Sequence, residues 1–189
     1  MSRLIFDDVA CARGGRMLFE DLSFTVGPGE AALVTGPNGC GKSSLLRLAA
    51  GLLAPAAGTI VRDGAVALAA EAAALDEDRS LIDALAFWAR LDGQDKQAVA
   101  QALAAMQLTA LAEVPVRLLS TGQRRRATLA RVIAGRAPLW LLDEPGNGLD
   151  TAALEALGAA MEGHLASGGL ILAASHQPLG LTHTREIAL

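Results

Sequence analysis

The stretch GPNGCGKSS, residues 36–44, constrains the fold of this chain more than any other part of it. Four of its residues satisfy G-x-x-x-x-G-K-[ST], the spacing of a phosphate-binding loop: Gly36, Gly41, Lys42 and Ser43. Such a loop requires a strand before it and a helix after it. The apolar run 31–35 enters the loop, so we expect an α/β protein built around a strand, loop and helix unit.

The segment after the loop, residues 44–53, places Leu45, Leu48 and Leu52 at helical spacing and predicts a helix over its whole length. The glycines let backbone N–H groups turn toward phosphates without obstruction by Cβ, and the N-terminus of the helix adds partial positive charge. The residues expected to bind nucleotide here are Gly36, Pro37, Asn38, Gly39, Cys40, Gly41, Lys42, Ser43 and Ser44.

Three polar side chains complete the expected chemistry of the loop. Lys42 is expected to reach the β- and γ-phosphates, Ser43 to ligate Mg²⁺ and Ser44 to hydrogen-bond the α-phosphate. A glycine turn that carries a surface lysine is the alternative interpretation, and the full spacing between flanking strand and helix disfavours it.

Two adjacent carboxylates, Asp143 and Glu144, end the hydrophobic stretch LWLLDEP. Because side chains alternate along a strand, the two carboxylates point differently. We expect Asp143 to hold Mg²⁺ through water and Glu144 to polarise the water that attacks the γ-phosphate. A charged strand end exposed to solvent is the alternative.

The remaining pattern predicts one domain with two kinds of structure. Residues 18–26 alternate apolar and polar side chains and predict an antiparallel β region near the N-terminus. Residues 76–116 are helical in pattern and predict a helical subdomain inserted in the α/β core. The expected organisation is a single domain, 1–189, with its core at about 1–75 and 136–189 and its helical subdomain at about 76–135.

Charge and composition exclude several function classes. The net charge of −4 provides no basic field to displace counterions, so nucleic acid is a disfavoured partner. The start MSRLIFDDVA lacks the basic and then apolar pattern of a secretory signal, and no apolar run is long enough to span a bilayer. We therefore expect a cytoplasmic protein that reaches a membrane only through a partner, with Cys11 and Cys40 as free thiols.

The segment LSTGQ, residues 119–123, resembles the signature motif of ATP-binding cassette (ABC) ATPases and lies in the order that this family shows, between the glycine loop and LWLLDEP. Beyond it, GLD at 148–150 resembles the D-loop and His176 the switch histidine of the family. The motifs cover essentially the whole chain. This resemblance implies a P-loop NTPase core that binds ATP and Mg²⁺ and hydrolyses ATP.

In that family the signature of one subunit closes on the ATP held by the other, which implies a head-to-tail homodimer. Ser120, Gly122 and Gln123 would then act in trans, and Asp150 joins the nucleotide-binding set. The implied catalytic residues are Glu144, His176 and Lys42. Without the resemblance, LSTGQ is a helix cap, and a lone histidine after a strand is more often structural than catalytic.

Other polar residues have no such placement. His164 and His183 are expected at the surface, and the run Arg124–Arg126 predicts a solvated helix face that contacts nearby carboxylates. The chain departs from the family at two positions. Arg13 stands where an aromatic residue usually stacks on adenine, and Glu71 is the best-placed substitute for a glutamine that contacts the metal; a plain surface residue is the alternative for Glu71.

The segments CARGGRMLFEDLSFTVGPGE, FWARLDG, LSTGQRRRATLAR and LWLLDEPGNGLD are similar to the ATP-binding subunits of the cytochrome c maturation haem exporter. This resemblance implies integral membrane permease partners, the cytochrome c maturation membrane proteins, and a peripheral position on the cytoplasmic face of the bacterial inner membrane. The implied role is haem export or release of haem from its chaperone. A soluble ATPase of an assembly process, or the ATPase of another small exporter, is the alternative.

Overall fold

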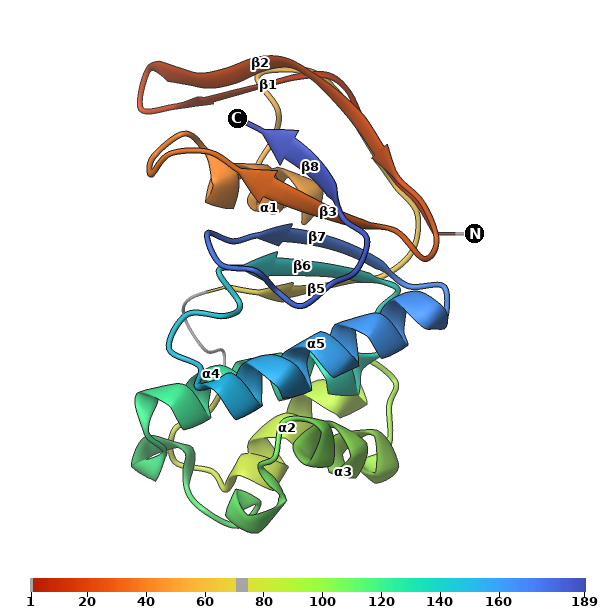
Figure 1. Cartoon of the computed structure of the whole chain (residues 1–189). Helices are drawn as coiled ribbons and strands as arrows, with labels where there is room; N and C mark the ends of the chain where they lie inside the picture. Colours follow the sequence, from red (N-terminus) through yellow and green to blue (C-terminus); the bar gives the residue numbers. More distant parts are fainter. Residues whose placement is uncertain (1, 71–74) are drawn as a thin grey trace.

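The computed structural model describes residues 2–70 and 75–189, which form two β-sheets and a layer of helices (Figure 1). The smaller sheet is antiparallel, with the strand order β2-β1-β4. Its strands are β1 Leu4–Arg13, β2 Arg16–Val26 and β4 Ala57–Arg62. The antiparallel region expected near the N-terminus is therefore confirmed.

The larger sheet is parallel throughout, with the order β5-β6-β7-β3-β8. Its strands are β3 Ala31–Thr35, β5 Val66–Ala69, β6 Leu139–Asp143, β7 Leu170–Ala174 and β8 Arg185–Ala188. Alternate side chains of its strands enter two different cores. Trp140 and Ile171 pack with the helices, whereas Leu141 and Leu172 pack with the antiparallel sheet. A parallel sheet buried on both faces confirms the α/β class.

The helix after the glycine loop, α1 Lys42–Ala49, lies between the two sheets and is shorter than the sequence pattern predicts. Gly51 has φ 73°, its N–H donates to Leu48 O, and the N–H of Leu52 donates to Arg47 O. These two bonds form a Schellman motif, which ends a helix at a left-handed glycine. Leu52 is consequently 70% exposed, so the prediction that it lies on this helix is wrong.

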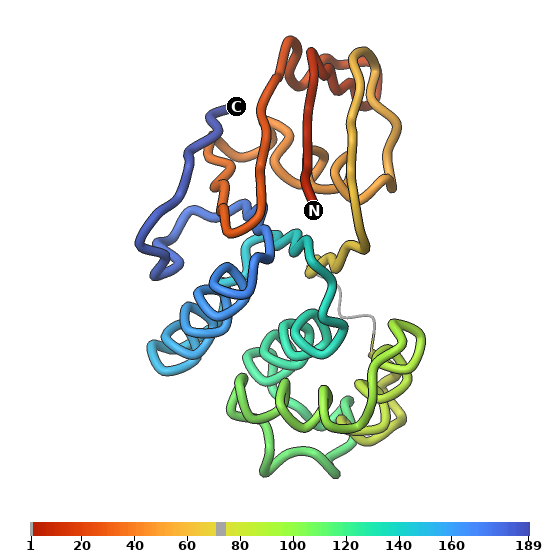
Figure 2. The backbone as a smooth tube through the Cα atoms, turned by 90° about the vertical axis from the view of Figure 1, so that its right-hand side faces the viewer, coloured from red at the N-terminus to blue at the C-terminus, as the bar shows by residue number. Residues whose placement is uncertain are grey.

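The remaining helices cover the other face of the parallel sheet and extend beyond it. They are α2 Leu81–Leu91, α3 Lys96–Ala105, α4 Thr121–Gly135 and α5 Thr151–Ala166, with short 3₁₀ turns at Thr109–Leu111 and Val116–Leu118. Figure 2 shows α2, α3 and α4 gathered at the end of the molecule opposite the antiparallel sheet. Every helix in residues 2–70 and 75–189 is too short or too polar to cross a membrane.

The four helices of this layer each begin at a side-chain cap. Ser80, Asp95, Ser120 and Asp150 each accept the backbone N–H three residues ahead and so begin α2, α3, α4 and α5. Such caps contribute about 0.5–2 kcal/mol each. The N-terminus of α4, which carries the LSTGQ motif, is therefore fixed by the motif's own side chains.

His164 is not the surface residue that the sequence suggested, whereas His183 is exposed as expected. The His164 ring stacks on Trp140 with 3.9 Å between ring centroids and an interplanar angle of 10°. Its Nε2 lies 3.1 Å from Pro138 O and 3.3 Å from Leu170 O, and a Cβ on Gly169 would collide with the ring. His164 therefore joins α5 to the N-terminal ends of β6 and β7. No local sequence pattern predicts its stacking on Trp140.

We expect this histidine to make stability depend on pH. Burial lowers the pKa of His164, an effect that its bonds to the carbonyls of Leu170 and Pro138 partly oppose. The unfolded chain then binds the proton more tightly than the folded chain, so the contribution is present above the unfolded pKa of about 6.5 and is lost as the pH falls below it. In urea unfolding, the urea concentration at the midpoint should decrease when the pH is lowered from about 7.5 to about 5. His164→Gln should make this decrease smaller.

The exposed His183 supplies the matched control. His183→Gln should keep the pH dependence of the parent protein. An equal pH dependence in the parent and in His164→Gln would show that the stacked histidine contributes nothing to it.

Candidate nucleotide-binding site

Three segments of the sequence meet at the C-terminal edge of the parallel sheet. The glycine loop follows β3, Asp143 ends β6, and His176 comes two residues after β7. The strands β6, β7 and β3 are neighbours in the sheet, so these segments come together although they lie far apart in the chain. The edge at which parallel strands end is the usual place for a ligand in an open α/β sheet.

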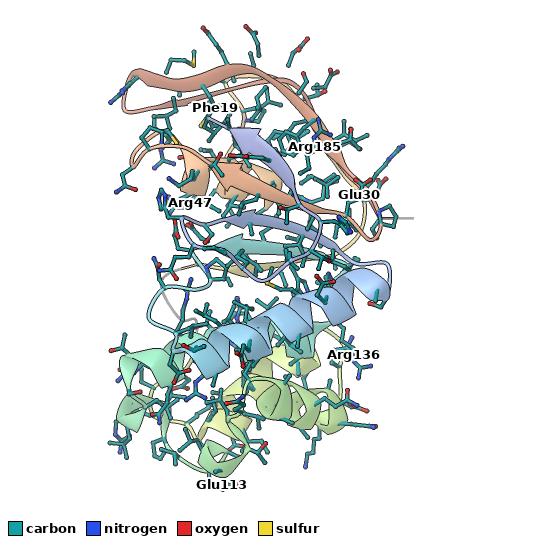
Figure 3. All side chains as sticks on the ribbon, viewed as in Figure 1. Phe19, Glu30, Arg47, Glu113, Arg136 and Arg185 are labelled. Atoms are coloured by element: carbon teal, nitrogen blue, oxygen red, sulfur yellow. The ribbon has the colours of Figure 1, made fainter. Side chains whose placement is uncertain are left out.

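The glycine loop adopts backbone conformations that favour glycine. Gly36, Gly39 and Gly41 have φ values of 142°, 82° and 119°. A Cβ on Gly41 would also lie 3.1 Å from the ring of Phe19, which Figure 3 labels on β2. Gly41 directly precedes α1, so the first N–H groups of this helix face the loop.

Lys42 is 8% exposed and crosses the loop, where its Nζ donates to Gly36 O at 2.8 Å and to Pro37 O at 3.2 Å. Ser44 lies within hydrogen-bonding reach of the Cys11 thiol on β1, whose pKa is raised by burial. The loop is thus held both by its own lysine and by the antiparallel sheet.

A cavity of about 290 Å³ opens at this edge and joins the loop to both carboxylates. Its lining residues are Leu18, Asn38, Gly39, Gly41, Lys42, Ser43, Ser44, Asp143 and Glu144. The Ser43 hydroxyl and the Asp143 carboxylate therefore face one space, and oxygen donors of these two kinds suit Mg²⁺. Leu18, on β2, carries no motif that identifies it as a site residue, and sequence reasoning missed it.

Glu144, His176 and Asn38 form a connected group beside this cavity. Glu144 Oε2 accepts the backbone N–H of His176 at 3.3 Å, and Glu144 Oε1 lies 3.4 Å from His176 Nε2. The same Nε2 lies 3.1 Å from Asn38 Oδ1. Both neighbours of Nε2 are oxygen acceptors, so the tautomer with its proton on Nε2 fits this arrangement. The three groups come from the ends of β6 and β7 and from the glycine loop.

The signature residues lie apart from this cavity, at the start of α4. Ser120 accepts the N–H of Gln123, and Gln123 Oε1 accepts the N–H of Ser120, so the two form a capping box. A Cβ on Gly122 would lie 3.1 Å from Gly148 O, which brings the start of α4 against the GLD segment of the same chain. Asp150 of that segment caps α5 by accepting the N–H of Ala153 at 2.8 Å.

The arginine run contacts backbone more than carboxylates, so the prediction of a solvated face is wrong for most of it. Arg124 pairs with Glu77 at 3.1 Å, as expected. Arg126 donates instead to the carbonyls of Met106 and Gln107. Arg125 reaches the carbonyls of Ala70, Asp143 and Glu144 beside the cavity. No sequence signal separates Arg125 from its two neighbours.

The structure describes only one of the two positions at which the sequence departs from the family pattern. Arg13 is exposed at the end of β1, opposite Arg16 in the hairpin. Glu71 lies outside the described residues, and its expected metal contact stays a prediction.

Comparison with known proteins supplies the family. The family model described as ABC transporter matches residues 19–147. The cytochrome c biogenesis ATP-binding export protein CcmA of Sphingopyxis alaskensis is 56% identical over 98% of this chain and 96% of its own length. The CcmA protein of Zymomonas mobilis is 54% identical over 100% of this chain and 85% of its own length.

A solved structure agrees with the fold. The chain is similar to a putative metal-chelate type ABC transporter in an inward-facing conformation, with a TM-score of 0.84 and 26% identity. The match covers 100% of this chain and 79% of that one. The chain belongs to the ABC transporter family of ATP-hydrolysing proteins and, within it, to the family of the cytochrome c biogenesis ATP-binding export protein CcmA.

Proposed function

We propose that this chain is the ATPase subunit of a membrane export complex that serves cytochrome c maturation, where ATP hydrolysis supports haem export or the release of haem from a periplasmic chaperone. The convergence of the glycine loop, Asp143 and the Glu144–His176 pair at one sheet edge carries the ATPase part of the proposal. The names of the relatives, which describe cytochrome c biogenesis and export, support the biological part.

The glycine loop binds the triphosphate of ATP in this proposal. Backbone N–H groups of the loop and of the first turn of α1 donate to phosphate oxygens, and the Lys42 ammonium offsets the charge of the γ-phosphate. Ser43 and Asp143 would hold Mg²⁺, because both line the cavity. When bound, Mg²⁺ supplies positive charge that stabilises the phosphates during transfer.

Glu144 activates the attacking water. Its carboxylate lies at the end of β6 on the wall of the cavity, and its side chain is only 22% exposed. His176 holds the carboxylate through its backbone N–H and places its Nε2 between Glu144 and Asn38 of the glycine loop. From that position the imidazole can donate to the γ-phosphate as the carboxylate takes a proton from water.

Two copies of the chain close head to tail around two ATP molecules. Ser120, Gly122 and Gln123 of one copy then contact the nucleotide of the other, and Asp150 lies beside them at the D-loop. Opening of the dimer after hydrolysis moves integral membrane permease subunits, the cytochrome c maturation membrane proteins. The subunit itself is peripheral, on the cytoplasmic face of the inner membrane, and Glu71 is a further proposed metal ligand.

The role of Glu144 is tested by Glu144→Gln, which keeps the size of the side chain and removes its basicity. We expect ATP hydrolysis to fall by at least about 100-fold while ATP binding persists. ATP should then convert the variant from a monomer to a dimer in sedimentation measurements. Glu155→Gln, on the exposed face of α5, is the matched control and should hydrolyse ATP like the parent. Hydrolysis by Glu144→Gln at the parental rate would remove Glu144 from the mechanism.

The proposed nucleotide contact of the glycine loop is tested at Cys40. This thiol is partly exposed, whereas Cys11 is buried, so an alkylating reagent should react first at Cys40. A Cβ on Gly36 would lie only 2.8 Å from Cys40 Sγ, so the thiol packs against the glycine loop and an added group is expected to disturb it. We expect hydrolysis to fall in proportion to alkylation and ATP to slow the reaction. Cys40→Ala should resist the reagent; complete alkylation of Cys40 without loss of hydrolysis would contradict the contact.

The membrane partner is tested by capture of tagged Glu144→Gln from its native membranes, with and without ATP. Recovery of cytochrome c maturation membrane proteins is the expected result, with Glu155→Gln as the control for binding that does not depend on the trapped state. Recovery of soluble proteins alone would favour an assembly ATPase and overturn the export proposal, with the ATPase chemistry unaffected.

A further inference from the structure

We propose that Arg125 is a positioning residue for ATP hydrolysis, because it holds the backbone that directs the Glu144 carboxylate and joins that backbone to α4. The inference rests on the role proposed above for Glu144. Through this contact, the position of α4, the helix that begins at the signature motif, would influence the activation of water by Glu144.

The guanidinium of Arg125 contacts three carbonyls at the ends of two different strands. Its Nη1 donates to Ala70 O at 3.0 Å, just after β5. Its Nη2 donates to Asp143 O at 2.5 Å and to Glu144 O at 2.6 Å, at the end of β6. A planar, permanently charged group with donors in a fixed fork suits three acceptors in this arrangement, and bonds from a charged donor are stronger than bonds between neutral groups.

The backbone that Arg125 holds is strained. Glu144 has φ 48°, a left-handed conformation that is uncommon for a residue with a side chain. Such a conformation persists only where the surroundings fix it. The N–H of Glu144 donates to Ala174 O on β7 at 2.8 Å, and Arg125 holds the carbonyls on both sides of that residue. Removing the guanidinium frees one side of the strained turn, so the carboxylate is expected to leave its place beside His176.

Arg125 also connects the turn to α4. A groove of about 710 Å³ lies between α4 and the catalytic edge, lined on one side by Ser43, Asp143 and Glu144 and on the other by Thr121 and Arg125. Arg131, two turns along α4, donates to Leu68 O of β5. Both arginines therefore fix α4 against the end of β5, and Arg125 also donates a hydrogen bond to Glu144 O. Arg125 thereby provides a direct hydrogen-bonded link between α4 and the turn that carries the carboxylate.

The adjacent arginines show that this contact is particular to one position of the helix. Arg124 pairs with Glu77, and Arg126 donates to Met106 O and Gln107 O, each at 3.4 Å, within the helical layer. Arg126 has the same chemistry, lies on the same helix and also donates to backbone carbonyls, but the carbonyls it reaches belong to the helical layer. It supplies the matched control.

The first test compares Arg125→Gln, Arg125→Lys and Arg126→Gln in steady-state ATP hydrolysis by the purified full chain. We expect Arg125→Gln to lower kcat by at least about 10-fold while KM for ATP changes by less than about threefold, since binding by the glycine loop does not involve Arg125. Arg125→Lys keeps the positive charge and loses the forked arrangement of donors, so its kcat should lie between those of the parent protein and Arg125→Gln. Arg126→Gln should stay within about twofold of the parent. Thermal unfolding of each variant checks the fold, and Arg125→Lys carries the test if Arg125→Gln does not fold.

The second test separates positioning from general support of the structure. If Arg125 acts through the Glu144 carboxylate, then adding Arg125→Gln to Glu144→Gln should change the residual single-turnover rate by less than about twofold. A full multiplicative loss in the double variant, or a parental kcat in folded Arg125→Gln or Arg125→Lys, would overturn the inference. Glu144→Gln alone reports on the proposed function: an active Glu144→Gln refutes the role of Glu144, whereas an inactive one together with an active Arg125→Gln refutes only the role of Arg125.

Discussion

The parallel pairing of β6, β7 and β3 is the constraint on which the rest of the site depends. It brings Asp143, His176 and the glycine loop to one edge, although more than 90 residues of chain separate the loop from Asp143. Parallel sheets are found almost only where both faces are buried, and here α2 to α5 cover one face while α1 and the antiparallel sheet cover the other. The two hydrophobic cores therefore determine the geometry of the polar edge between them.

The sequence predicts the parts of this site that depend on local patterns. A phosphate-binding loop needs a fixed spacing of glycine, lysine and serine, so its position and its strand and helix context can be read from residues 31–49. The hydrophobic pattern predicts too long a helix for α1, because Leu52 continues the helical spacing. Gly51 ends the helix through backbone hydrogen bonds, which such a pattern does not reveal. Contacts between distant segments are harder to predict from the sequence, because they depend on the tertiary fold. Examples are the stacking of His164 on Trp140, the position of Leu18 in the cavity wall and the hydrogen bond from Arg125 to Glu144 O.

Glu144 shows how structural strain and proposed function meet at one residue. Its left-handed backbone turns the chain sharply after β6, and this turn places the carboxylate beside His176 instead of along the strand. The conformation is held by Ala174 on one side and by Arg125 on the other. These anchors belong to the sheet and to α4, so the turn that carries the carboxylate is hydrogen-bonded to both elements.

The capping box at the start of α4 is compatible with the contact proposed in trans. Ser120 uses its oxygen to accept the N–H of Gln123, which leaves its hydroxyl proton available to donate. Gln123 uses Oε1 to accept the N–H of Ser120, which leaves the two donors of its amide group available. The bonds that begin the helix therefore consume acceptors and preserve donors, and donors are what the phosphates of a nucleotide require. One set of side chains can in this way fix the end of α4 and present a phosphate-binding surface to a second copy of the chain.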